Sequence, residues 1–383
     1  MSLFLILLII LSSLVTLVYL TFIILFTYGW VKTKTYSSSK EIHPVSISVI
    51  IPFRNEEKNI SGILSCLKNQ NYNKDYLEVI LINDHSEDQG FQIAEKFIND
   101  NLLHNFKILS LKDNEGFSKK AALTKGIISA NSRLIITSDS DCWFGNDWVK
   151  TFADFYLTNN CRVISAPVII SNEKKLFSKI QQLEFMSLIA SGAGAIGAGI
   201  PILANGANFA FEKTLFDELN GYEDNKEIVS GDDVFFLLKA KKHLSSPKDI
   251  MFLKHPDSLV FTKGCKTMKH FFNQRIRWAS KSKRYKDFTE IAVAASVFFI
   301  NLFFLVCFIG GFLNAHLFYI ALILWAVKFI ADFPLLMSFS VFVSKSKVMY
   351  YYLLVQLIYP LYIIITTFLT LMIPVKWKGR KIV

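Results

Sequence analysis

The sequence predicts an α/β fold for residues 31–289, with membrane helices before and after it. Three segments contain no Asp, Glu, Lys or Arg, namely residues 1–30, 291–327 and 348–375. Because a helix needs about 20 apolar residues to cross a bilayer, each segment is long enough to do so. Between them, short apolar runs alternate with helical patterns, which is typical of parallel strands with helices on both faces of the sheet.

The first uncharged segment favours an uncleaved membrane anchor over a signal peptide. It has no basic n-region. Its apolar run over residues 3–29 is also longer than the roughly 7–15 residues of a signal-peptide core. The expected organisation is an anchor, a soluble domain and a C-terminal membrane region, at residues 1–30, 31–289 and 290–383.

The C-terminal region is expected to hold three membrane segments. Lys328 and Asp332 lie one helical turn apart there, so structural pairing is favoured over a catalytic role. Three crossings would place the basic tail at residues 376–381 outside, against the positive-inside rule. Either one segment is re-entrant or the rule is broken. The expected segments are residues 291–312, 314–341 and 348–374, the last interrupted by Pro360.

The net charge of +11 is concentrated near the membrane segments. Nine Lys or Arg and no acid lie between Ser258 and Lys286, a patch that suits nucleic acid, anionic lipid or a pyrophosphate. Nucleic acid is disfavoured, because the patch adjoins a membrane segment and no nucleic-acid fold motif accompanies it. Five scattered cysteines without metal-ligand spacing favour unpaired thiols in a reducing cytosol.

Polar side chains follow three expected strands of the soluble domain. Strands are expected at residues 45–52, 77–84 and 134–139, and helices at residues 56–66, 92–101 and 119–129. Ligands of such sheets bind beyond the carboxyl ends of the strands. The side chains at these ends suit a nucleotide site, although the alternative is that the strand ends are simply solvated. They are Arg54, Asn55 and Glu56, then Asp84, then Asp139 and Asp141.

Two acidic motifs carry candidate chemistry. Asp139 and Asp141 are separated by one residue at a strand end and could hold a divalent cation together with a diphosphate. Asp232 and Asp233 begin an apolar helical pattern. They either cap that helix, or one of them is a general base that takes a proton from a hydroxyl group.

Two further segments leave alternatives open. On a helix, Gln274, Arg277 and Trp278 share one face, where the arginine could clamp a pyrophosphate and the tryptophan could stack on a sugar. The alternative is a membrane-surface helix with its arginine on lipid phosphate. The small-residue run at 191–199 is either a flexible loop or a site of close helix packing.

In their order, these motifs resemble those of the membrane-integrated members of glycosyltransferase family 2, which have a GT-A fold with a Rossmann-like mixed sheet. The similarity extends over residues 45–290, and the pentapeptide at 274–278 is its most specific part. The tail at residues 377–380 also looks like a family ending. The motifs are Ile51-Pro52-Phe53-Arg54-Asn55-Glu56, Asn83-Asp84, Asp139-Ser140-Asp141, Gly206-Ala207-Asn208, Asp232-Asp233 and Gln274-Arg275-Ile276-Arg277-Trp278.

The resemblance implies a role for each of these residues. Asp233 would be the catalytic base, and Asp232 stands where the family usually has Glu, which puts any role of that Glu in doubt. Asp139 and Asp141 would hold Mg²⁺ or Mn²⁺. The donor-binding residues would be Arg54, Asn55, Glu56, Asp84, Lys119, Lys120, Asp139, Asp141 and Arg277. The acceptor-binding residues would be Asn208, Gln274 and Trp278.

The implied reaction is a single inverting displacement that moves a sugar from a UDP-sugar to an acceptor. A lipid-linked or glycolipid acceptor is favoured slightly, and a processive synthase elongating a β-linked glycan is the alternative. A membrane-anchored scaffold that binds anionic lipid is an alternative of another class. A transporter is disfavoured, because there are too few membrane segments for inverted repeats. The expected location is the inner or plasma membrane, with the catalytic domain in the cytosol.

Overall fold

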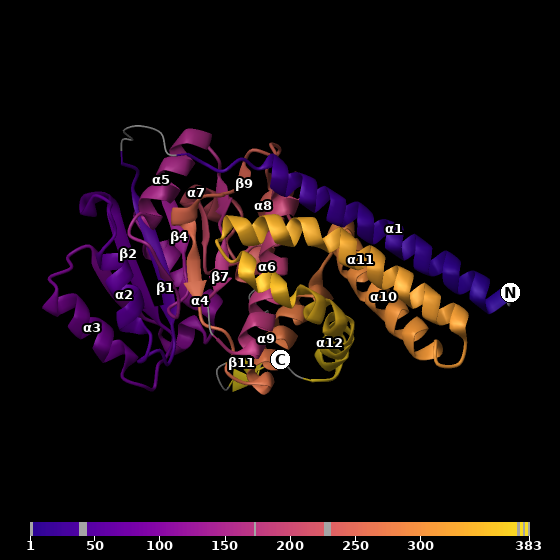
Figure 1. Cartoon of the computed structure of the whole chain (residues 1–383). Helices are drawn as coiled ribbons and strands as arrows, with labels where there is room; N and C mark the ends of the chain where they lie inside the picture. The colour runs from indigo at the N-terminus through magenta and orange to yellow at the C-terminus, as the bar shows by residue number, and fades with distance from the viewer. Residues whose placement is uncertain are drawn as a thin grey trace. The chain divides into compact units, whose positions relative to one another are not determined.

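The computed structural model describes residues 3–37, 44–171, 174–225, 231–373, 376–377 and 380–381. The chain forms two compact units (Figure 1). Unit 1 contains Met1–Val31, Asn172–Ala198 and Cys265–Val383, and unit 2 contains Lys32–Ser171 and Gly199–Gly264. Residues 172–198 and 265–289, which the sequence groups with the soluble domain, therefore belong to unit 1. The division at residues 31 and 290 remains a prediction.

A seven-stranded sheet forms the centre of unit 2. Its strand order is β3-β2-β1-β4-β8-β6-β9. The first four strands are parallel, and β8 runs antiparallel to both of its neighbours, which confirms the expected mixed sheet. The strands are β1 (Ile47–Phe53), β2 (Leu77–Asn83), β3 (Phe106–Ser110), β4 (Leu134–Thr137), β6 (Val163–Ser165), β8 (Phe209–Glu212) and β9 (Ile250–Phe252).

The three strands expected from the sequence are largely buried. All seven residues of β1 and all four of β4 are buried. Central parallel strands are covered on both faces, so their sequences are continuous apolar runs rather than alternating ones. A smaller sheet consists of β5 (Trp143–Phe144), β10 (Val260–Thr262) and β7 (Val168–Ile170).

The helices of unit 2 confirm the three expected between the strands and the one expected from Asp232 onward, and they add two more. Helix α4 packs closely on β1 and β2, because a Cβ at Gly126 would lie 2.6 Å from side-chain carbons of Ile50 and Ile82. The helices are α2 (Ile60–Lys68), α3 (Gly90–Asp100), α4 (Lys119–Ser129), α5 (Trp148–Asn159), α7 (Lys213–Glu218) and α8 (Asp232–His243). Short 3-10 turns are η1 (Lys74–Tyr76), η2 (Asp113–Glu115), η3 (Glu223–Asn225) and η4 (Pro256–Ser258).

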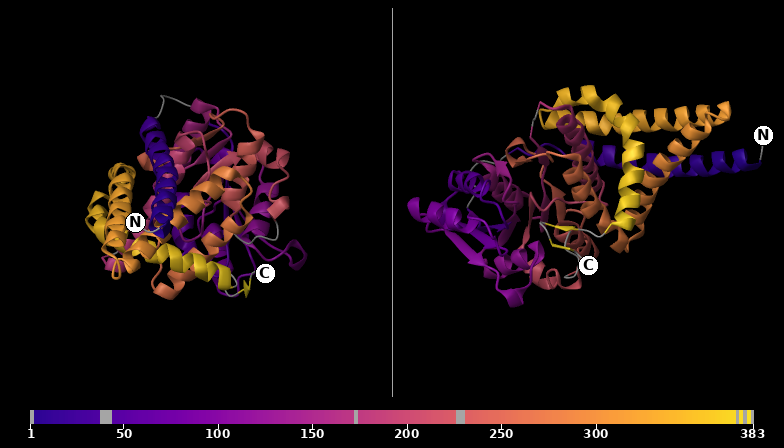
Figure 2. Two further views of the ribbon diagram at one scale, coloured as in Figure 1. Left: turned by 90° about the vertical axis from the view of Figure 1, so that its right-hand side faces the viewer. Right: turned by 90° about the horizontal axis from the view of Figure 1, so that it is seen from below.

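Unit 1 is helical, and in the described part of the chain four of its segments are long and apolar enough to cross a membrane (Figure 2). They are Leu5–Lys32, Phe288–Gly310, Ala315–Phe342 and Ser346–Met372. The elements are α1 (Leu3–Lys32), α6 (Leu176–Gly197), α9 (Met268–Ala279), η5 (Ser280–Arg284), α10 (Phe288–Gly310), α11 (Ala315–Phe342), η6 (Ser346–Tyr351), α12 (Tyr352–Met372), β11 (Lys376–Trp377) and β12 (Arg380–Lys381).

The structure confirms that Lys328 and Asp332 pair. Their side chains are 2.6 Å apart, and the hydroxyl group of Tyr19 donates to the same carboxylate at 2.5 Å. Gln356 accepts from Lys328 and donates to Asp332, both at 3.0 Å. The expected interruption at Pro360 is wrong, since α12 continues through that residue.

The small-residue run packs as a helix through residue 197. Residues 191–197 form the last turns of α6, which crosses α1 in unit 1. A Cβ at Gly29 would lie 2.0 Å from the carbonyl oxygen of Gly194, and a Cβ at Gly194 would lie 2.2 Å from that of Phe26. Two glycines therefore allow the helix backbones to touch, which is the packing alternative of the two.

Candidate functional site

The ends of β1 and β2 in unit 2 are joined by side chains expected in a donor site. Arg54 donates to the carbonyl oxygens of Asp84 at 3.0 Å and His85 at 2.7 Å, and its other terminal nitrogen reaches Glu87 at 2.8 Å. Asn55 accepts from the Glu87 N–H at 2.8 Å. Arg54 and Asp84 are buried, so they hold the two strand ends together from beneath.

Glu56 faces a different neighbour. Its carboxylate accepts from the amide of Asn59 at 2.6 Å, and its carbonyl oxygen receives the first N–H groups of α2. The side chain therefore stabilises the start of that helix, whereas Arg54, Asn55 and Asp84 gather at the sheet edge.

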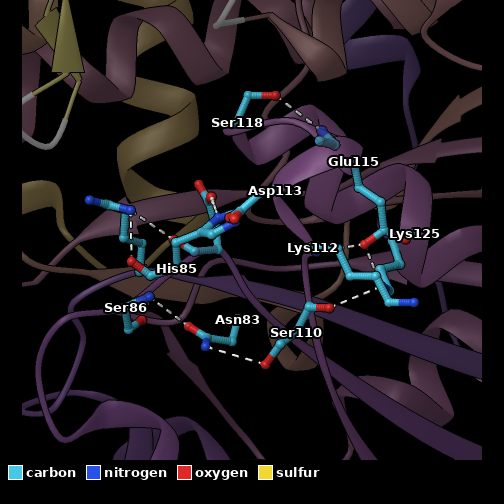
Figure 3. Close-up of polar contacts among 12 residues, drawn as sticks. Asn83, His85, Ser86, Ser110, Lys112, Asp113, Glu115, Ser118 and Lys125 are labelled. Atoms are coloured by element: carbon cyan, nitrogen blue, oxygen red, sulfur yellow. Dashed lines mark hydrogen bonds and ion pairs between the residues drawn. The ribbon is translucent and has the colours of Figure 1, made fainter.

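His85 is a site residue that the sequence analysis missed (Figure 3). Its backbone has a φ of 53°, and its ring lies between two carboxylates, 3.1 Å from Asp84 and 3.4 Å from Asp113. The ring stacks on Phe117 with centroids 4.2 Å apart. His85 thereby connects the end of β2 to the segment before α4. The available signal was its position directly after Asp84 at a strand end.

The segment before α4 is ordered by its own polar contacts. Glu115 accepts from the Lys112 N–H at 2.7 Å and from Lys125 at 2.6 Å (Figure 3). Ser118 is the N-cap of α4 and accepts from the Ala121 N–H at 3.1 Å. This cap fixes the first turn of α4, which carries Lys119 and Lys120.

The ammonium group of Lys119 lies among the carboxylates of unit 2. It is 2.6 Å from Asp139 and 3.6 Å from Asp232. Burial acts to lower the pKa of Lys119, but the nearby carboxylates of Asp139, Asp232 and Asp233 outweigh it and raise the pKa. Lys119 therefore stays protonated at neutral pH. Lys120 points elsewhere, with its buried ammonium 5.4 Å from the Phe235 ring centroid.

Gly206 lies where these charged groups meet. Its N–H donates to Asp233 at 2.8 Å, and its carbonyl oxygen accepts from Thr137 at 2.8 Å. A Cβ here would lie 3.1 Å from a carboxylate oxygen of Asp232 and 3.5 Å from the nitrogen of Lys119. The absence of a side chain at this position keeps the space between those groups open.

Asn208 is placed differently from the other candidate residues. It is fully buried, and its amide oxygen accepts from the Trp148 indole at 3.0 Å. Its amide nitrogen donates to the carbonyl oxygens of Pro167 and Ser258, both at 2.7 Å. These contacts favour support of the 206–208 loop from beneath over a direct contact with an acceptor.

Asp232 and Asp233 begin α8, as the sequence predicts. The carboxylate of Asp233 accepts from the N–H groups of Gly206 at 2.8 Å and Val234 at 2.7 Å, so its orientation is fixed. Asp232 is buried and Asp233 is half-buried, which leaves the second carboxylate more accessible.

Asp139 and Asp141 fit an open metal site rather than a closed one. Both are half-buried and follow β4, and Asp141 is next to the buried thiol of Cys142. Burial and the nearby Asp141 and Asp139 carboxylates raise the pKa of that thiol. Among the described residues, no three His, Cys, Asp or Glu side chains gather as a metal site. Two carboxylates suit Mg²⁺ or Mn²⁺ that also takes phosphate oxygens as ligands.

The pentapeptide of residues 274–278 lies on α9 in unit 1. Its best-anchored residue is Arg275, which is buried and donates through two nitrogens to both carboxylate oxygens of Glu184. Another of its nitrogens donates to Gln274. The guanidinium lies 4.2 Å from the Trp278 ring centroid, so it covers part of that ring, and Arg277 is half-buried.

Two anchoring residues of unit 1, Glu184 and Tyr362, were missed by the sequence analysis. Tyr362 of α12 donates to the Glu184 carboxylate at 2.9 Å, which completes the set formed by Glu184, Arg275 and Tyr362. Glu184 is the only acid of α6, and that was an available signal. The sequence contained no signal for Tyr362, because a single tyrosine in an apolar helix does not by itself predict a contact.

Both units contain residues that the sequence analysis predicted as site residues. In unit 2, the structure brings together Lys119, Asp139, Asp232 and Asp233, and it joins Arg54, Asn55 and Asp84 at the neighbouring strand ends. In unit 1, it groups Gln274 and Trp278 around Arg275. The Lys119 ammonium can bind a negatively charged ligand at this sheet edge. One of the neighbouring carboxylates can act as a base beside that ligand.

Comparison with known proteins gives a family match over part of the chain and a fold. Residues 48–220 match the sequence family described as "Glycosyl transferase family 2". Probable glycosyltransferase YdaM of Bacillus subtilis (strain 168) is 25% identical over 243 residues, which cover 61% of this chain and 54% of that protein. Beta-monoglucosyldiacylglycerol synthase of Trichormus variabilis is 25% identical over 250 residues, which cover 64% and 51%. The chain spans about half the length of these curated relatives.

One solved structure matches nearly the whole chain. Mannosyltransferase PcManGT from Pyrobaculum calidifontis, solved with GDP-Man and Mn²⁺, superposes with a TM-score of 0.53. The match has 16% sequence identity and covers 93% of this chain and 97% of that chain. At this identity the likeness establishes the fold alone, which is the expected GT-A fold.

Proposed function

Residues 48–220 match glycosyltransferase family 2, and from this premise we propose that the chain transfers a sugar from a nucleotide sugar to an acceptor at a membrane. The observation that carries the proposal is the grouping of Lys119 with Asp139, Asp232 and Asp233. It provides a cation for a diphosphate, and carboxylates for a metal and for proton removal, within one cluster.

The donor is proposed to be a UDP-sugar bound at the strand ends of unit 2. Asn55, Glu56 and Asp84 would bind the uridine, and Arg54 would hold the two strand ends in place. Lys119 would contact the diphosphate, with Lys120 supporting the same helix turn. Asp139 and Asp141 would hold Mg²⁺ or Mn²⁺, which neutralises charge on a departing diphosphate.

Asp233 is proposed to be the general base. Its carboxylate is held by the N–H groups of Gly206 and Val234 and remains partly accessible. The base would take the proton of the acceptor hydroxyl as the oxygen attacks the anomeric carbon and the C–O bond to the diphosphate breaks. A single displacement inverts the configuration, so an α-linked donor gives a β-linked product.

A lipid-linked or glycolipid acceptor is proposed in preference to a growing polysaccharide. The apolar helices of unit 1 support a membrane location, and one relative is named as a synthase of monoglucosyldiacylglycerol. Gln274 and Trp278 would bind the acceptor, and Arg277 would bind the leaving diphosphate. We assign Asn208 to supporting the 206–208 loop. The proposed location is the inner or plasma membrane, with unit 2 in the cytosol.

The test uses the full chain in detergent with Mg²⁺ or Mn²⁺. UDP-sugars are screened for UDP release, with and without membrane lipid extract. Release that requires lipid, with a product soluble in organic solvent, supports the proposal. A growing polymer formed without lipid would establish the processive alternative. If no nucleotide sugar is bound or cleaved, the proposal fails and the anionic-lipid scaffold gains weight.

Asp233→Asn tests the base within the same assay. Turnover should fall by about 10²–10⁴-fold, while donor binding is largely retained. Asp217→Asn is the matched control, because Asp217 is exposed on α7 outside the cluster. Unchanged turnover in Asp233→Asn would remove this residue from the role.

A further inference from the structure

Helix α12 is apolar and long enough to cross a membrane, but its first turns contact the middle of α11 and its last turn contacts the turn before α10 begins. We propose that only α1, α10 and α11 cross the bilayer. Helix α12 then lies along the membrane surface on the side of α9, with its apolar face in the lipid.

The three crossing helices are defined by contacts at successive levels. Leu8 of α1 packs with Cys307 of α10 and Ala321 of α11. Farther along, Tyr19 contacts Asp332, and the ring centroids of Trp30 and Phe339 lie 5.1 Å apart. Helices α1 and α11 are therefore parallel, and α10 ends where both of them begin. We call this level the far end, and the level where α1 and α11 finish the near end.

Helix α12 crosses α11 instead of running beside it. Three residues spread over two turns of α12 contact one turn of α11. Tyr352 donates to the carbonyl oxygen of Phe329 at 2.6 Å, and Gln356 donates to Asp332 at 3.0 Å. Tyr359 lies under Lys328, with the ammonium 4.7 Å from its ring centroid. Figure 2 (right) shows α12, in yellow, running across the direction of α1 and α11.

The C-terminal end of α12 lies beside the start of α10. Lys283, in the turn just before α10 begins, donates to the carbonyl oxygen of Thr370 at 2.8 Å. A crossing α12 would instead finish beside Gly310, at the other end of a 23-residue helix that is about 34 Å long. After α12, strand β11 contacts α9, which precedes α10. The tail and α9 therefore share one level.

The depth of the crossing point suits an interfacial helix. Phe329 follows the first residue of α11 by 14 positions, which correspond to about 21 Å of helix. With the far end of α11 at one boundary of a hydrocarbon core about 30 Å thick, α12 lies about 9 Å inside the other boundary. Interfacial helices are buried by about 5–10 Å at that boundary.

One face of α12 is apolar and exposed along its whole length. The opposite face carries Gln356, Thr366 and Thr370, which are buried within unit 1. Acyl chains of the near leaflet would cover the exposed face, because it continues from the first turn to the last. The exposed residues are Leu353, Leu357, Leu361, Ile365, Phe368 and Leu371.

The charges of the chain support three crossings independently. With three crossings, the turn at residues 311–314 lies on the far side, and it contains no Lys or Arg. Lys345 and Lys347, and the tail residues Lys376, Arg380 and Lys381, then lie on the near side. Four crossings would put that tail on the opposite side, against the positive-inside rule.

Two experiments on the full chain test the proposal. In the first, intact cells expressing Lys381→Cys or Asn314→Cys are treated with a membrane-impermeant maleimide. Asn314→Cys should be labelled in intact cells, and Lys381→Cys only after the cells are permeabilised. The parent chain is the background control, since four of its five cysteines are buried and Cys66 is in unit 2. Labelling of Lys381→Cys in intact cells would overturn the proposal.

The second experiment measures depth along α12 directly. Leu353→Cys, Leu361→Cys and Phe368→Cys each receive an environment-sensitive dye, and nitroxide lipids quench the dye at two depths in vesicles. The three depths should agree within a few ångström. A crossing helix would separate the outer two labels by about 22 Å, the rise of 15 residues, and that result would contradict the proposal.

Discussion

Arg275 and Glu184 form a buried ion pair that joins two helices of unit 1. The guanidinium donates to both carboxylate oxygens, and the hydroxyl group of Tyr362 donates to one of them at 2.9 Å. The rings of Phe271 and Trp278 lie 4.6 and 4.2 Å from the guanidinium carbon. Arg275 therefore sets the orientation of Trp278 while holding α9 to α6.

Removing one partner of this pair should strongly destabilise unit 1. Arg275→Met or Glu184→Leu leaves an unpaired buried charge, which costs about 3–5 kcal/mol. The double variant removes both charges and should recover much of that loss. Thermal unfolding in detergent measures this, with Lys269→Met on the exposed side of α9 as control. A double variant no better than the worse single variant would contradict the expectation.

Gly206→Ala should lower turnover without unfolding the protein. Its Cβ would approach the Asp232 carboxylate at 3.1 Å and push on the groups around Lys119. Misplacing catalytic groups by about 1 Å can cost about 10²-fold in rate, so a loss of about 10–100-fold is expected. Gly145→Ala is the control, because nothing lies within 4 Å of the Cβ it would add. Wild-type turnover in Gly206→Ala would show that the reaction does not require the open space beside Gly206.

Lys119→Met should make unit 2 sensitive to divalent cations. The substitution leaves Asp139, Asp232 and Asp233 facing one another without their ammonium partner. The unfolding temperature should fall at low ionic strength, and millimolar Mg²⁺ should raise it more in the variant than in the wild type. Lys58→Met, at an exposed position, should show neither effect. Equal responses to Mg²⁺ would argue against a shared negative cluster.

Gly194→Ala should disrupt the crossing of α1 and α6. The added carbon would lie 2.2 Å from a backbone oxygen of α1, which cannot move aside without separating the helices. Gly62→Ala is the matched control, since its added carbon meets nothing within 4 Å on α2. That control should be neutral or stabilising by up to about 1 kcal/mol, the helix propensity of alanine over glycine. Protease resistance of unit 1 in detergent distinguishes the two variants.

Glu212 should contribute acid sensitivity to unit 2. Burial acts to raise the pKa of this carboxyl group, but hydrogen bonds from Tyr156, Arg162 and Arg133 outweigh it and lower the pKa. A lowered folded-state pKa contributes stability that is complete above the ordinary value of about 4.3 and is lost as the pH falls through the folded value.

Glu212→Gln therefore should lower the unfolding temperature at pH 7 and flatten its decline between about pH 5 and 3. The measurement is a series of thermal unfolding curves across that range. Glu95→Gln, at an exposed position of α3, should keep the wild-type slope. An unchanged slope in Glu212→Gln would show that other groups cause the acid sensitivity.

The long apolar strands and the membrane helices could be predicted from the sequence, because their patterns are local. Strands such as β6 and β9 could not, because each has three residues and pairs across a large separation, as Val163 does with Ile250. The prediction at Pro360 was wrong for a related reason. A proline in the sequence predicts an interruption of the helix, whereas packing within unit 1 keeps α12 helical through this residue.

The acidic motifs of the candidate site were found for the same local reason, since Asp139 and Asp233 begin or follow regular elements. The roles of Asn208 and Arg275 could not be read in this way. Each is a polar residue in a motif, but its contacts are with groups distant in the chain. For Asn208 these are Trp148 and Pro167, and for Arg275 the contact is Glu184.

The pairing of Glu184 with Arg275 also has a consequence for synthesis of the chain. Glu184 is made 91 residues before Arg275 and 178 residues before Tyr362. At a synthesis rate of about 5–20 residues per second, Arg275 is made roughly 5–18 s after Glu184, and Tyr362 is made roughly 9–36 s after it. During that interval the only acid of α6 lacks the partners that it has in the folded chain. Unit 1 can therefore reach its final packing only after the last helix has left the ribosome.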